Sequence, residues 1–154
     1  MADRRHTLTS MFGVEIEGID VQSYFRECSS LTISTHFTPQ AEGGLNDHTH
    51  YLLDQTTIQP ITLKRGIIQQ FDLFDWYSEV TRGMLIKRPL TIKAYRNRVK
   101  NMGSGPDGLF AAPVITWVLL DALPVKWVGP AFNANANAIA VEEITFICDG
   151  LMRH

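Results

Sequence analysis

Apolar and polar residues alternate with a period of two in several short stretches of this chain. Such alternation is typical of a β-strand with one face on a core and the other in water. In the second stretch, Leu31, Ile33 and Phe37 fall on one side, and Pro39 is expected to end the strand because proline cannot donate to a sheet ladder. Strands of this kind are predicted at residues 12–19, 31–37, 61–66 and 90–99.

The longest apolar pattern lies near the C-terminus, between residues 113 and 151. An apolar run at residues 114–120 is expected to turn at Leu123-Pro124 and to return as a strand at residues 144–148. Both runs are rich in β-branched and aromatic residues, so they predict a pair of strands that closes the core. The expected packing residues of this region are Trp117, Trp127 and Phe132.

Two segments break the strand pattern. Residues 69–81 change to helical spacing and predict one flanking α-helix, with Asp72 and Asp75 near its positively polarised start and Gly83 at its end. Residues 40–59 are polar and have no sustained period, which predicts a long functional loop or a hairpin arm. This segment is the first candidate for contact with another molecule.

The pattern as a whole predicts a mainly β fold in a single domain over residues 1–154. About seven short strands separated by turns favour two antiparallel sheets that form a small barrel or sandwich. The composition is 45% hydrophobic and 19% charged, which is typical of a globular chain and excludes a disordered one.

Charge is distributed unevenly although the net charge is only -2. Residues 82–100 hold seven of the 14 basic residues and no acid. Separated charge of this kind is compatible with a head-to-tail interface between copies, with a solvated strand face, or with nucleic-acid binding. The last alternative is disfavoured by the overall acidity and by the shortage of interleaved aromatic residues.

The N-terminal residues carry no apolar segment after their basic residues, and the chain has no apolar window long enough to span a bilayer. We therefore expect neither a signal peptide nor membrane insertion. Cys28 and Cys148 lie far apart and have no CxxC spacing, which fits synthesis in a reducing cytoplasm with both thiols partly buried. A long-range disulfide between them is the alternative.

Candidate chemistry is sparse. His48 and His50 share a face if they lie on a strand, but a metal site needs a third ligand, and only Asp47 and Asp54 are near in sequence. Adjacent acids at positions 142 and 143 point to opposite faces of a strand, so they cannot form a carboxylate dyad. No nucleophile elbow, phosphate loop or zinc-protease motif occurs. The sequence thus predicts no enzyme, no metal and no cofactor.

A succession of short motifs resembles the tail tube proteins of contractile bacteriophages and the inner tube proteins of extracellular contractile injection systems. The resemblance spans nearly the whole chain in order. Its pieces are Phe12-x-Val14-x-Ile16-x-x-Gly18, the segment Phe25 to Leu31, Glu42-Gly43-Gly44 with Asn46, Ile61 to Gly66, Asp75-Trp76, Arg88-Pro89, Trp117, Ala122 to Trp127, Pro130-Ala131-Phe132, and Asn137-x-Ile139-Ala140-x-Glu142 through Gly150-Leu151.

This resemblance implies a structural role. Six copies would form a ring, rings would stack into a hollow tube inside a contractile sheath, and the long loop would reach the neighbouring ring. The implied partners are further copies of the chain, the sheath protein, baseplate and tail-terminator proteins, and DNA or protein cargo that passes through the lumen without specific binding. We expect the basic segment 82–100 to face the sheath or a neighbouring subunit and not the lumen.

Eleven residues are the candidate subunit-interface positions. Small side chains near residue 138 would let two backbones approach closely, and the glycines and histidines lie on the long polar segment. The set is Glu42, Gly43, Gly44, His48, His50, Arg96, Arg98, Asn137, Ala138, Ala140 and Glu142.

Two alternatives stay open from the sequence. A tube-initiating baseplate ring would have the same fold and would bind other proteins. A metal-binding or small-molecule-binding β-barrel belongs to another class, and zinc lost on replacing His48 and His50 would reveal it. The sequence distinguishes neither a phage from an injection device nor one cargo from another.

Overall fold

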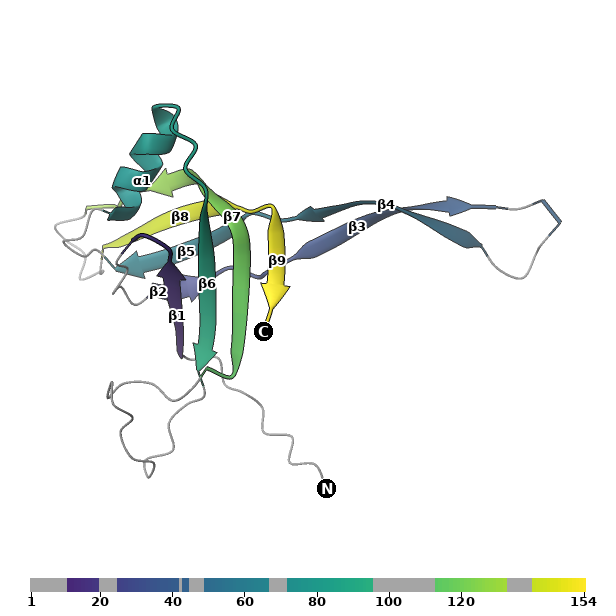
Figure 1. The fold of residues 1–154 in the computed structure, drawn as a ribbon, viewed down its shortest axis with the longest axis horizontal. Helices are drawn as coiled ribbons and strands as arrows, with labels where there is room; N and C mark the ends of the chain where they lie inside the picture. The colour runs from purple at the N-terminus through teal and green to yellow at the C-terminus, as the bar shows by residue number, and fades with distance from the viewer. Residues whose placement is uncertain are drawn as a thin grey trace, which may run out of the picture.

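The computed structural model describes residues 11–19, 25–41, 43–44, 49–66, 72–95, 113–132 and 140–154. These residues form two antiparallel layers, one helix and a long two-stranded arm that projects from the sandwich (Figure 1). The elements are β1 Met11–Ile16, β2 Phe25–Cys28, β3 Ile33–Gln40, β4 His50–Ile58, β5 Ile61–Gly66, α1 Asp72–Thr81, β6 Arg88–Tyr95, β7 Ile115–Val128, β8 Val141–Ile147 and β9 Gly150–Arg153.

The long strand β7 belongs to both layers. Its first half pairs with β6 and β9, and its second half pairs with β8, which continues to β5 and β2. Asp121 lies between the halves with a φ of 51°, in the left-handed region, and this conformation bends the strand. The expected turn at Leu123-Pro124 is therefore wrong, because Pro124 stays in the ladder opposite Phe146.

The core lies between the two layers and beneath α1. Alternation places every second residue of β5 inside, so Ile61, Leu63 and Arg65 are buried. Trp117 and Trp127 pack against the core, as expected. The remaining buried apolar residues are Val14, Ile16, Phe25, Leu73, Trp76, Leu90, Ile92, Leu119, Ala122, Ile144 and Phe146.

Helix α1 covers one end of the sandwich. Leu73 and Trp76 point inward, and the Trp76 indole N–H donates to the carbonyl of Ile86 at 2.8 Å. Gly83 ends the helix, as predicted: its φ is 92°, and the N–H groups of Gly83 and the next residue return to carbonyls in the last turn. The helix begins at Asp72, and residues 69–71 of the predicted range lie outside the described residues.

The arm continues a ladder that begins in the sandwich. The Cys28–Leu63 pair joins β2 to β5, and the Ile33–Ile58 pair joins β3 to β4. Five residues separate the two pairs on both sides of the hairpin, so the pairing register is the same at both places. Two backbone bonds, from Ser29 and Gln59, bridge the gap at 2.8 and 3.0 Å. Half of one long hairpin is thus built into the core, and the other half stands in solvent.

Of the two alternatives predicted for residues 40–59, the hairpin arm is confirmed and the long loop is wrong, since β4 pairs with β3 along residues 50–58. Pro39 does not end the preceding strand either, because β3 runs to Gln40 and Pro39 lies opposite Tyr51. Nearly all of β4 is exposed on both faces. Without a covered face, this strand needs no apolar alternation, and the sequence pattern therefore carried no strand signal.

Candidate assembly surfaces

The outer half of the arm has one apolar face. Facing residues of an antiparallel pair project to the same side, so Phe37 and Leu53 share a face with Pro39 and Tyr51 two residues further along. The rings of Phe37 and Tyr51 meet edge to face, with centroids 5.5 Å apart. Phe37, Tyr51 and Leu53 are 59%, 61% and 76% exposed. We call these four residues the arm face.

An isolated two-stranded hairpin is marginally stable in water, and an exposed apolar patch marks a contact surface. Besides its backbone ladder and the contact between the Phe37 and Tyr51 rings, the arm is held by polar pairs. Examples are the hydroxyls of Thr35 and Thr56, 2.9 Å apart, and Thr38, which donates to Asp54 at 3.0 Å. No Lys or Arg occurs from residue 27 to residue 63. The arm is therefore an apolar surface without positive charge that the other described residues leave uncovered.

A second exposed apolar surface lies at the opposite end of the sandwich (Figure 1). Strand β7 ends at Val128, and the following segment runs away from the arm to Phe132, which is 84% exposed. The expectation that Phe132 packs in the core is therefore wrong. Phe74 of α1 is 41% exposed and packs edge to face on Trp127, with ring centroids 4.8 Å apart. We call Phe74, Val128 and Phe132 the end surface.

A buried ion pair holds this end in place. Arg65 and Glu142 form a salt bridge, with side chains 3% and 14% exposed. The second carboxylate oxygen of Glu142 accepts from the Trp127 indole N–H at 3.3 Å, and the Arg65 guanidinium lies over the Phe25 ring at 6.0 Å. The network joins β2, β5, β7 and β8, so it fixes the register where β7 leaves the sandwich.

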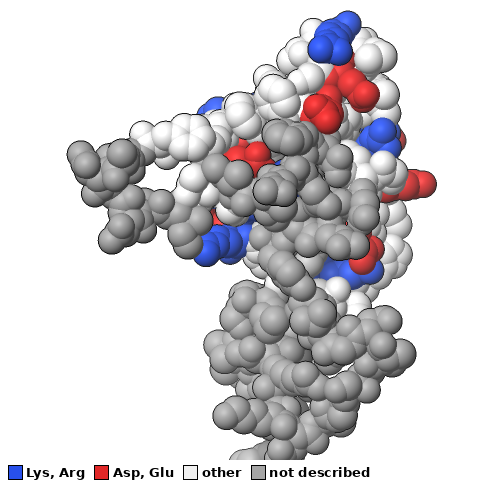
Figure 2. All heavy atoms as spheres, turned by 90° about the vertical axis from the view of Figure 1, so that its left-hand side faces the viewer, with Lys and Arg blue, Asp and Glu red and all other residues white. Residues whose placement is uncertain are grey.

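The described part of the basic segment makes contacts within its own chain. Lys87 donates to Asp149 at 2.5 Å, and Lys93 donates to Glu15 at 2.6 Å. Arg88 donates to the carbonyl of Glu17 at 3.0 Å. Figure 2 shows basic and acidic side chains interspersed over the described part of the face it displays. Charge pairing with a neighbour through this segment stays a prediction.

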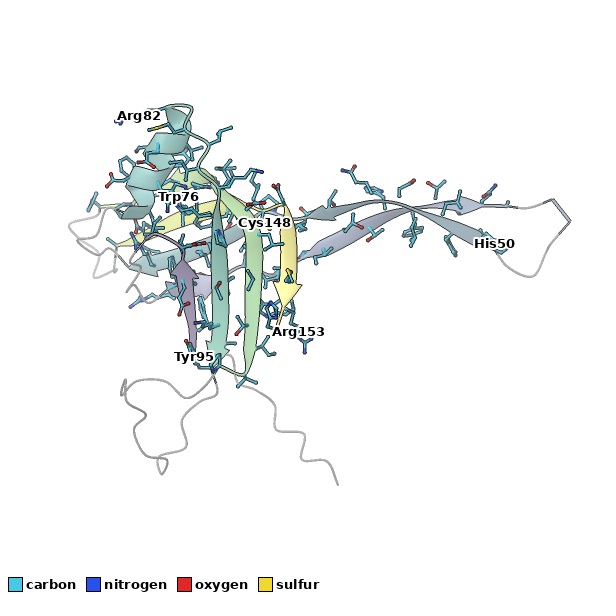
Figure 3. All side chains as sticks on the ribbon, viewed as in Figure 1. His50, Trp76, Arg82, Tyr95, Cys148 and Arg153 are labelled. Atoms are coloured by element: carbon cyan, nitrogen blue, oxygen red, sulfur yellow. The ribbon has the colours of Figure 1, made fainter. Side chains whose placement is uncertain are left out.

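The structure groups the predicted interface residues that it describes into two places. Gly43 and Gly44 lie at the outer end of the arm with His50, which Figure 3 labels far from the sandwich. Ala140 and Glu142 lie at the start of β8, near the end surface. Their roles in an interface stay predictions. The others, Glu42, His48, Arg96, Arg98, Asn137 and Ala138, lie outside the described residues.

Sequence reasoning missed the arm face and the end surface. Phe37, Tyr51 and Leu53 looked like ordinary strand residues or part of a polar loop, and Phe132 looked like core. One signal was present: residues 51–53 are a run of three large apolar residues inside a polar segment. Three adjacent large apolar residues indicate a surface that is buried against other residues. They do not indicate whether those other residues belong to the same chain.

Three titrating side chains of the described region have raised pKa values, and no cluster of metal ligands is found there. Burial raises the pKa of the Cys28 thiol to about 11, and burial together with Asp149 raises the pKa of Cys148. The bond to Asp149 raises the pKa of Lys87. Within the described ranges, no three His, Cys, Asp or Glu side chains gather as metal ligands would, and the two cysteines are free thiols. His48 lies outside those ranges, so the histidine pair stays a sequence hypothesis.

A β-sandwich with an uncovered apolar arm is the architecture of a subunit that assembles with other chains. The sequence profile of the T4-like virus tail tube protein gp19 matches residues 8–152. The chain therefore belongs to this tail tube family, whose members are structural components of phage tails and contractile injection particles. No curated protein sequence matches the chain.

Solved structures with the same fold come from contractile injection systems. A chain of the extracellular contractile injection system PVC sheath-tube complex in its extended state is 25% identical, with 99% of this chain and 93% of that chain covered and a TM-score of 0.78. A chain of the anti-feeding prophage tube-terminating cap is 22% identical over 100% and 94%, with a TM-score of 0.79. A chain of the six-fold symmetrised anti-feeding prophage baseplate is 20% identical over 97% and 96%, with a TM-score of 0.74.

With ten residues, α1 falls short of what a membrane-spanning helix needs, and it is the one helix among the described residues.

Proposed function

We propose that this chain is the main subunit of the inner tube, with six copies in each ring and with rings stacked through the arm. The arm carries the proposal, because it continues the β2–β5 ladder and exposes an apolar face that no other described residue covers. Rings whose contact surfaces differ on their two ends stack without closing, which produces a filament. The six-fold symmetry of the anti-feeding prophage baseplate supports the ring size.

The proposed partners follow from the same assignment. A tube of this kind contacts a sheath protein outside, a baseplate at one end and a terminator at the other, as the related assemblies suggest. DNA or a protein cargo passes through the lumen without specific binding. We assign the chain no catalytic role, since the family is structural. In this role the sandwich forms the tube wall, and the arm connects one ring to the next.

A tube-initiating ring at the baseplate is the second candidate. A baseplate chain shares this fold at a TM-score of 0.74, close to the 0.78 of the sheath-tube chain, so the fold does not separate the two roles. The two roles differ in assembly. A main subunit stacks on copies of itself, whereas an initiator stops at one ring and binds other proteins.

Electron microscopy of the purified full chain across a concentration series tests the proposal. We expect six-fold rings that stack into hollow tubes at high concentration. A matched variant in which a short turn replaces residues 34–57 should fold and lose stacking, because the β2–β5 ladder ends before the deletion. A chain that stays monomeric at high concentration would contradict the tube assignment, and single rings that never stack would favour the initiator.

A further inference from the structure

The arm face and the end surface lie beyond opposite ends of strand β5 (Figure 1). Strand β5 starts beside the base of the arm at Ile61 and ends at Gly66, which pairs with Val141 near the end surface. In Figure 1 the arm projects to the right of the sandwich, and the segment after β7 runs to its left. A copy displaced along the strands thus brings its end surface toward the arm of the next copy.

The base of the end surface is held in place by the packing around Trp127. Trp127 is fixed by Phe74, by its bond to Glu142, and by the backbone that follows it. A Cβ at Gly129 would lie 2.7 Å from the rim of the Trp127 ring, so only glycine lets the chain turn so closely past the indole. This arrangement fixes how the chain leaves β7 before it reaches Phe132.

The chemistry of the two surfaces also matches. The arm face presents two aromatic rings, a proline and a leucine, and its segment lacks positive charge. The end surface presents two phenylalanines and a valine, with the exposed cation of Lys126 between Trp127 and the bulge in β7. Exposed aromatic and large apolar side chains of this kind are typical anchors of protein interface centres.

We infer that the end surface, Phe74, Val128 and Phe132, is the site on which the arm face of a copy in the adjacent ring docks. This inference rests on the proposed tube function and adds the receiving residues. Each copy then gives an arm at one end and accepts an arm at the other. The same head-to-tail contact repeats from ring to ring, and no closed dimer forms.

Disulfide trapping in assembled tubes tests the contact directly. Cys28 and Cys148 are first replaced by alanine, and Leu53→Cys is combined with Phe132→Cys in one chain. Since both surfaces are on every copy, oxidation should give a ladder of covalent multimers beyond the dimer. The matched control combines Leu53→Cys with Leu85→Cys, which is also exposed, at 66%, but follows the C-terminal end of α1. We expect no ladder from the control.

A second pair of variants keeps the inference falsifiable without cysteines. Phe132→Ala should raise the concentration needed for stacking by roughly tenfold or more, as loss of a central apolar anchor does, and should leave single rings intact. Leu85→Ala is the control and should leave stacking unchanged.

The outcomes separate this inference from the tube function. If tubes form but only the Leu85 pair cross-links, or neither pair does, the receiving site is wrong and the tube assignment stands. If Phe132→Ala removes rings as well as stacks, Phe132 lies between neighbours within a ring, which also overturns the inference. If the unmodified chain forms no rings or tubes, the proposed function itself fails.

Discussion

One ladder of paired strands runs through two different environments in this protein. In the sandwich, β5 alternates between buried and half-buried residues, and Leu63 is fully buried. In the arm, every residue of β3 is exposed, although the ladder enters the arm in the register that it has in the sandwich. The sandwich covers its own apolar residues, whereas the arm leaves Phe37, Tyr51 and Leu53 for another molecule to cover. Substitutions in the sandwich should therefore lower the stability of the monomer, whereas substitutions in the arm should weaken assembly and leave the monomer stable.

The largest expected effect is in the sandwich, at Glu142→Ala. Removal of this carboxylate takes away one buried ion-pair contact of the Arg65 guanidinium and the acceptor of the Trp127 indole N–H. Loss of one partner of a buried pair costs about 3–5 kcal/mol of unfolding free energy. Urea unfolding of the monomer measures it.

The adjacent residue gives the control for that experiment. Glu143 lies on the same strand but pairs with Lys64 at 3.9 Å in a half-exposed position. Glu143→Ala should cost less than about 1 kcal/mol. Equal losses at the two positions would show that the buried network does not hold the sandwich together.

The next effect contrasts a thiol in the sandwich half of the ladder with one in the arm. Burial raises the pKa of Cys28 from 9.0 to about 11, so its thiolate fraction near pH 8 is about a hundredfold below that of an exposed thiol. In a Cys148→Ala background, native Cys28 should react with a thiol reagent far more slowly than a cysteine placed in the arm by Thr35→Cys with Cys28→Ala. Similar rates would mean that the thiol on β2 is as accessible and as easily ionised as the thiol in the arm.

The same shift fixes the sign of a pH effect. The folded pKa lies above the unfolded one, so the unfolded thiol loses its proton first as the pH rises. The contribution of Cys28 to stability is complete below about pH 9 and declines between pH 9 and 11. A Cys28→Ala variant should lack this part of the alkaline decline in urea unfolding.

The smallest effect on folding is expected in the arm. Leu53 is 76% exposed and has no core contact to lose, so Leu53→Ser should change the unfolding free energy of the monomer by less than about 0.5 kcal/mol. The same variant should stack poorly into tubes. A marked loss of monomer stability would mean that the arm is covered by its own chain.

The sequence predicted those parts of the fold in which one chain covers its own apolar residues. The predicted pairing of the run at residues 114–120 with the strand at residues 144–148 was wrong, since that run pairs with β6 and β9. The alternation of β5 and the helix with its end at Gly83 were readable. Strand β4 was not, because a strand exposed on both faces needs no alternation. The bend in β7 was not readable either, because Asp121 adopts a left-handed φ that is uncommon for residues other than glycine.

The candidate site was predictable only in part. The segment after β3 was singled out as a contact region, and the glycines and His50 found there lie on the arm. The apolar anchors were missed, because hydrophobicity indicates that a side chain is covered and does not indicate by which copy. Phe132 shows this most clearly: its chemistry is that of a core residue, and its exposure is 84%. A repeating assembly completes its core across subunits, which a single chain does not reveal.

Amide hydrogen exchange in the free chain and in assembled tubes tests the central claim, that the arm obtains its stability from a neighbouring copy. We expect the amides of β5 and β8 to be protected in both states, because their ladder lies over the core. The amides of β3 and β4 should exchange rapidly in the free chain and become protected on assembly. Arm amides that are as protected in the free chain as in the tube, or that stay unprotected in the tube, would contradict it.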